Sequence, residues 1–170
     1  MKKVILSVVA VFAFGLANAQ EVKFGVIAGA DFATSKIEVE GLNVSNNTTA
    51  FFGGFFADFT ASEKFHVQPE LVIVTADGGS QLQLPILAKY YIADKVSVLA
   101  GPDLLFDLNE KIEGFKSFGV GIDFGAAYDI NEHFMVEAKY NLGLTDFFED
   151  APSGYSAKVN GFFLGLGYKF

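Results

Sequence analysis

A two-residue alternation of apolar and polar side chains runs through most of the sequence after residue 20, and no other feature constrains the fold as strongly. Successive side chains of a β-strand point to opposite faces, so this period predicts strands. The alternation is found in eight segments, 22–33, 50–60, 65–76, 81–92, 95–106, 118–130, 133–145 and 159–170. None of them has the spacing of an amphipathic helix. The chain is therefore predicted to be all-β, in one domain built of hairpins.

One face of every segment is free of charge and rich in Phe, while the charged residues and most glycines lie on the other face. In a soluble barrel the Phe-rich face would have to fit inside. Eight strands leave an interior just wide enough for side chains, so that face must point outward, into lipid. A bilayer also requires that every strand be hydrogen-bonded on both sides. The sequence thus predicts a closed antiparallel eight-stranded up-and-down transmembrane β-barrel.

The connections between the segments alternate in length. Those at 61–64, 93–94 and 131–132 are tight, whereas those at 34–49, 107–117 and 146–158 are long and polar; 77–80 is a short exception. Outer-membrane barrels have short periplasmic turns and long outer loops, so the tight turns are predicted to be periplasmic. An aromatic girdle is expected at that rim. Its predicted members are Phe59, Tyr90, Tyr128 and Tyr168.

The first residues, "MKKVILSVVAVFAFGLANAQ", have the pattern of a secretory signal peptide. Lys2 and Lys3 precede the apolar run 4–16, and the small residues at 17–19 form a cleavage site. A membrane-anchor helix is the alternative, but the apolar run is too short to cross a bilayer. We therefore expect residues 1–19 to be a signal peptide and 20–170 to be the barrel domain, exported to the bacterial outer membrane.

Charge and cysteine content exclude several classes of function. The chain has a formal net charge of −8, and all of its basic residues are Lys. An acidic chain without Arg is unsuited to nucleic acid, because phosphate contacts need clustered cations. There is no Cys, which excludes disulfides, thiolate metal sites and a lipid-anchor cysteine. No cofactor or metal site is expected.

Charged residues on the inward face are the main candidate site. The predicted interior network consists of Glu70, Lys89, Asp123, Glu137 and Lys139. Hairpin pairing should bring Glu70 beside Lys89 and Asp123 beside Lys139. A gated ion path or proton site is one interpretation, because buried carboxylates often mark such sites. We favour a structural plug, since a narrow barrel fills its lumen with paired charges.

The sequence offers little for catalysis and two places for surface binding. The only histidines, His66 and His133, are predicted to lie beside tight turns at the periplasmic rim, so no catalytic triad is expected. If a surface ligand binds, the loops 34–49 and 146–158 are the predicted places, since loops on a rigid scaffold often carry binding.

Three prolines fall inside predicted strands, where we expect β-bulges because proline cannot donate to a ladder. They are Pro69, Pro85 and Pro102.

Four stretches, "VKFGVIAGADFA", "KFHVQPELVIV", "LQLPILAKYYI" and "VEAKYNLGLTD", resemble the PorT-like outer-membrane β-barrel proteins of Bacteroidetes. The chain departs from the family pattern at Gln83, where an acid is common, and at Lys139, where Arg is common. The resemblance implies an eight-stranded barrel inserted by the barrel assembly machinery, which would recognise the C-terminal Phe170. It implies no single activity.

Taken together, the sequence predicts a small monomeric outer-membrane barrel, porin-like in shape, with a plugged polar lumen and a structural or surface-binding role. Its expected partners are outer-membrane lipids and, during insertion, the assembly machinery. Three alternatives stay open: a lipid-modifying enzyme or protease of the outer membrane, a soluble periplasmic lipocalin-like carrier of apolar ligands, and a conducting pore.

Overall fold

The computed structural model describes residues 21–39, 42–109, 114–149 and 155–170. The expected signal peptide, residues 1–19, lies outside the described residues. The elements are eight strands, β1 (Glu21–Val39), β2 (Leu42–Thr60), β3 (Phe65–Ala76), β4 (Gly79–Ala93), β5 (Val96–Asp107), β6 (Phe118–Asp129), β7 (Phe134–Gly143) and β8 (Tyr155–Lys169). Within the described ranges, no helix is long and apolar enough to cross a membrane.

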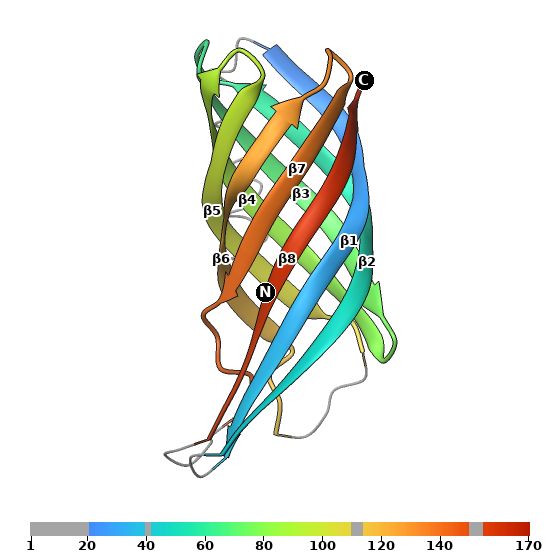
Figure 1. Ribbon diagram of the computed structural model, residues 1–170, viewed down its shortest axis with the longest axis vertical. Helices are drawn as coiled ribbons and strands as arrows, with labels where there is room; N and C mark the ends of the chain where they lie inside the picture. Colours follow the sequence, from blue (N-terminus) through green and yellow to red (C-terminus); the bar gives the residue numbers. More distant parts are fainter. Residues whose placement is uncertain (1–20, 40–41, 110–113, 150–154) are drawn as a thin grey trace, which may run out of the picture.

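The strands form one closed barrel in which each strand pairs with its sequence neighbours and β8 pairs back with β1. Every pairing is antiparallel. Figure 1 shows the strands tilted around the barrel axis, with the C-terminus at the end opposite the long β1–β2 hairpin. The predicted all-β, closed, antiparallel eight-stranded architecture is confirmed.

Inward and outward faces follow the alternation read from the sequence. Phe24, Phe55 and Phe124 are 57, 64 and 49% exposed, whereas Asp103, Lys89 and Glu137 are 0, 0 and 2% exposed. Large apolar side chains thus cover the outside, and charged ones are enclosed. This arrangement contradicts the lipocalin-like alternative, in which the Phe-rich face would form an internal pocket.

The predicted loop 34–49 is wrong, because nearly all of it is strand. β1 and β2 stay paired as far as Val39 and Leu42, and β8 pairs with β1 up to Val39 and Tyr155. Polar residues on both faces remove the alternation that would mark a strand in the sequence. In the structure they form hydrogen bonds between the two strands: the Thr34 Oγ1 donates to the Asn47 Oδ1 at 2.9 Å. The result is a three-stranded sheet that projects beyond the rest of the barrel (Figure 1). We call it the β8–β1–β2 extension.

The predicted β-bulges at Pro69, Pro85 and Pro102 are also wrong. β2 and β3 keep one register on both sides of Pro69, β3 and β4 do so around Pro85, and β4 and β5 around Pro102. The ladder is interrupted beside each proline instead, because proline has no N–H to donate. A register shift does occur nearby, between Tyr91 and Ala93.

Inward-facing glycines allow close approach between strands. A Cβ built on Gly54 would lie 2.0 Å from the carbonyl oxygen of Leu71, on the neighbouring strand. A Cβ on the adjacent Gly53 would meet nothing closer than 3.9 Å. The absence of a side chain is thus a steric requirement at Gly54 but not at Gly53.

Candidate functional site

The centre of the lumen is organised by Lys139, on β7. Its Nζ lies 2.5 Å from Oε2 of Glu70, 3.3 Å from Oε1 of Glu137 and 3.7 Å from Oδ2 of Asp123. All four residues are at most 3% exposed. One ammonium group therefore holds three carboxylates from β3, β6 and β7, which is how enclosed charges remain tolerable.

Asn141 extends this cluster toward the long-loop end of the barrel. It lies two residues beyond Lys139 on β7, so its side chain faces the same way. Its Nδ2 donates to Oδ1 of Asp123 at 2.6 Å and to Oδ2 of Asp103 at 3.0 Å. The amide thereby joins the three consecutive strands β5, β6 and β7 on the inner face of the barrel.

Gln68, on β3, extends the cluster toward the short-turn end. Its Nε2 donates to Oε1 of Glu70 at 2.8 Å and to Oε2 of Glu137 at 3.0 Å. Its Oε1 accepts from Nζ of Lys89 at 3.1 Å. Gln68 is 0% exposed and has no charge to mark it in the sequence. Its position on the inward parity, between His66 and Glu70, is the signal that could have found it.

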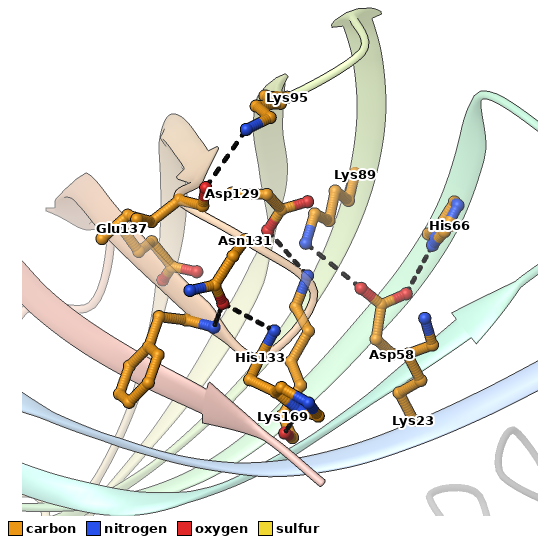
Figure 2. A network of polar contacts seen from close by, with 12 residues as sticks. Lys23, Asp58, His66, Lys89, Lys95, Asp129, Asn131, His133, Glu137 and Lys169 are labelled. Atoms are coloured by element: carbon orange, nitrogen blue, oxygen red, sulfur yellow. Dashed lines mark hydrogen bonds and ion pairs between the residues drawn. The ribbon is translucent and has the colours of Figure 1, made fainter.

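Asp58, on β2, connects Lys89 to His66, the last residue of this chain of contacts. Figure 2 shows it between Lys89 and His66. Its Oδ2 accepts from Nζ of Lys89 at 3.1 Å, and its Oδ1 lies 2.5 Å from Nδ1 of His66. A continuous polar network thus runs from His66 at the short-turn end to Asn141.

The five residues predicted for an interior network all lie in this one, but one predicted pair is wrong. Lys89 does not contact Glu70 directly; the contact passes through Gln68. The β3–β4 register explains the difference, because it places Lys89 opposite His66 rather than opposite Glu70. The predicted proximity of Asp123 and Lys139 is found, at 3.7 Å and diagonally, since Lys139 pairs with Gly125.

A second polar cluster lies at the short-turn rim. Nζ of Lys169 and the hydroxyl of Tyr91 each lie 2.7 Å from a different carboxylate oxygen of Asp129. Nδ1 of His133 lies 3.0 Å from the carbonyl oxygen of Lys169, and Figure 2 shows His133 beside that residue. Both histidines therefore lie at the short-turn rim, as the sequence predicts, and each has a hydrogen-bond partner there. Tyr91, which sequence reasoning missed, sits on the inward parity beside the predicted girdle residue Tyr90.

Three of the four predicted girdle residues are exposed on the outward face. Tyr90, Tyr128 and Tyr168 are 47, 48 and 37% exposed. Phe59 differs, at 6% exposed, where Val22 and Val67 flank it on the neighbouring strands. Phe170 is 69% exposed, and its N–H donates to the carbonyl oxygen of Phe24 at 2.8 Å.

The described part of the predicted loop 146–158 packs against the connection that precedes β6. The rings of Phe115 and Phe148 lie 5.0 Å apart, and their backbones form an isolated bridge. Asp146 Oδ1 accepts from the N–H groups of Phe148 and Ala157, at 3.1 and 2.9 Å. Residues 146–149 thus have a defined conformation, and β8 already begins at Tyr155.

The lumen is crossed by hydrogen bonds and ion pairs between opposite walls. Carboxylates outnumber lysines there. Among the described residues, no group of three His, Asp or Glu side chains is arranged to hold a metal ion.

The fold and its faces define a class of protein: a transmembrane β-barrel with an apolar exterior. A family model described as the outer membrane protein beta-barrel domain matches residues 79–149, from the start of β4 into the β7–β8 connection. The closed barrel, its lipid-facing exterior and this match place the chain in the bacterial outer membrane.

Solved structures share this fold at low sequence identity. A de novo designed transmembrane β-barrel has 12% identity and a TM-score of 0.58, over 89% of this chain and 99% of that one. Ail, the attachment invasion locus protein of Yersinia pestis, has 16% identity and a TM-score of 0.52, over 89% of this chain and 100% of its own. Neisserial surface protein A has 14% identity and a TM-score of 0.51, with the same coverage. A search of curated proteins found no match.

Proposed function

We propose that this chain is a monomeric, non-conducting and non-catalytic outer-membrane barrel that presents the β8–β1–β2 extension for binding at the cell surface. The observation that carries the proposal is the continuation of three paired strands beyond the other five. Paired strands hold a rigid shape, which lowers the entropy cost of binding relative to a loop.

The tip of the extension is more apolar than water-exposed sheet requires. Ile37, Leu42 and Val44 are 40, 73 and 63% exposed. Ile37 and Val44 are directly paired, so their side chains lie on the same face. Outer-membrane barrels have their short turns on the periplasmic side, so this tip, at the opposite end, is extracellular. An exposed apolar group there supports contact with another molecule.

The polar network in the lumen supports the rest of the proposal. The network from His66 to Asn141 joins strands on opposite sides of the barrel, which opposes both conduction and large motions of the wall. His66 and His133 are engaged at the short-turn rim, away from the surface where an enzyme acting on outer-leaflet lipid would need them. The enzyme alternative therefore has no geometric support in the described residues.

Site-specific photo-crosslinking in intact cells tests the proposal. A photoreactive residue replaces Val44, on the apolar face, and in a matched strain Ser45, which points to the other face. We expect a discrete crosslinked species from position 44 and much less of it from position 45. Equal products at both positions, or none at position 44, would contradict a binding role for this face.

A further inference from the structure

A carboxylate without a partner faces a cavity in the long-loop half of the lumen. The cavity has a volume of about 330 Å³ and is lined by inward-facing residues, among them Asp31, Gln83, Asn141 and Gly161. Asp31 is 4% exposed, and its Oδ1 accepts no hydrogen bond. The cavity lining includes Asn141, a member of the polar network, and the β3–β4 turn residues Asp77 and Gly78. We call it the outer vestibule.

No cation of the described chain reaches Asp31. Its partners in register are Ala50 on β2 and Phe163 on β8, which offer no charge. Lys139, in the central cluster, is held by Glu70, Glu137 and Asp123. Enclosing an unpaired carboxylate costs several kcal/mol unless a proton or a bound cation neutralises it.

The charges around the vestibule have one sign. Asp77 and Asp107 line it together with Asp31, and the described lining residues include no Lys or His. Asp107 is already engaged, because its Oδ1 accepts from the N–H and Nδ2 of Asn109 at 2.9 and 2.6 Å. A cleft with carboxylates of one sign on low-dielectric walls raises the local concentration of cations. Asp31, at the deeper position, is then the anchor.

We propose that the outer vestibule binds a small organic cation, with its ammonium group on the carboxylate of Asp31. The described residues offer no cluster suited to a metal ion, which favours a ligand held by one carboxylate and a few polar groups. Ser35 and Thr48 provide hydroxyls on the same wall, while Val74 and Leu105 provide apolar surface for a short hydrocarbon body. The volume is at the lower end of small-molecule sites. This proposal does not depend on what binds the β8–β1–β2 extension.

The structure also supplies a variant that blocks the site without removing a charge. A Cβ built on Gly161 would lie 2.6 Å from Oδ1 of Asp31. The Gly161→Ala side chain would therefore displace the carboxylate from its present position. Glu63→Gln removes an exposed carboxylate at the opposite end of the barrel and serves as the matched control.

Isothermal titration calorimetry on the full barrel, refolded in detergent micelles, tests the proposal. The probes are butylammonium chloride, uncharged 1-butanol and sodium chloride as a competitor. We expect butylammonium to bind and butanol not to bind, with binding retained in millimolar sodium. Asp31→Asn should weaken binding by about tenfold or more, Gly161→Ala should also weaken it, and Glu63→Gln should leave it unchanged.

Several results would overturn the proposal. They are equal binding of butanol, full displacement by sodium, no binding of butylammonium, and unchanged affinity in Asp31→Asn. The comparison of probes on the unmodified protein stands even if a variant fails to fold, and a heated against unheated gel reports folding for each one.

Discussion

Lys139 on β7 and Glu70 on β3 form an ion pair of 2.5 Å between strands that are not neighbours in the barrel. The two strands lie four positions apart in a ring of eight, so this contact crosses the lumen. Gln68 and Glu137 repeat the same crossing at 3.0 Å. These contacts connect opposite walls of the barrel across the lumen.

Removing the central cation should destabilise the barrel. Lys139→Met leaves Glu70, Glu137 and Asp123 enclosed without their common partner, and breaking such a group typically costs about 3–5 kcal/mol. The change in the free energy of unfolding is measured by urea unfolding of the protein in micelles. Circular dichroism follows the transition, because the chain has no Trp for fluorescence. Lys158→Met removes an exposed lysine and should change stability by less than about 0.5 kcal/mol. Similar losses in the two variants would contradict the role given to Lys139.

Two adjacent glycines should respond very differently to the same substitution. Gly54→Ala places a Cβ 2.0 Å from the carbonyl oxygen of Leu71, so the β2–β3 wall must shift. Overpacking of this kind costs about 1–3 kcal/mol or more. Gly53→Ala meets nothing closer than 3.9 Å and is the control. The temperature at which the folded band disappears on a gel compares the two, and a drop of equal size for both would rule out the steric explanation.

The β8–β1–β2 extension should be dispensable for folding. Ser35 pairs with Asn46, so replacing residues 36–45 by Asn-Gly gives a two-residue turn in the existing register. We expect the shortened chain to keep its heat-dependent gel shift, because the strand pairings of the remaining barrel are unchanged. Loss of the gel shift would mean that the extension is part of the barrel's folding core rather than a binding surface.

Phe170 should matter for assembly in cells more than for the finished barrel. Its ring is 69% exposed, and its backbone N–H bond to Phe24 does not need the ring. Phe170→Ala should therefore lower the amount of folded protein in the outer membrane while leaving refolding in micelles unchanged. If refolding in micelles falls as much as assembly in cells, the ring has a structural role instead.

The barrel could be predicted from the sequence because lipid and a narrow lumen impose opposite chemistries on alternate residues. That rule gave the strands, their closure and the side on which Glu70 and Lys139 lie. It failed at 34–49, where the chain leaves the bilayer and polar residues on both faces no longer mark a strand. It also failed to find the partner of Lys89, because the register of a hairpin depends on its turn. A shift of a few residues in register is enough to separate two charged side chains that would otherwise be in contact.

Neutral residues account for the other omissions. Gln68 and Tyr91 complete the interior contacts, yet neither carries a charge that would single it out in the alternating pattern. Asp31 was visible as an inward acid, but the absence of a partner can be seen only once Ala50, Phe163 and Gly161 are placed around it. The β-bulges predicted at the prolines are not found, because the barrel tolerates a local gap in the hydrogen-bond ladder without a change of register.

Conductance in a planar lipid bilayer tests the closed, cross-linked lumen most directly. The refolded chain is inserted at single-molecule density, with a known porin inserted under the same conditions to show that incorporation works. We expect no resolved current steps at neutral pH and moderate voltage, because the network from His66 to Asn141 bridges opposite walls of the lumen. Steady, uniform steps from the chain would show an open path and would contradict the proposal that the barrel is non-conducting.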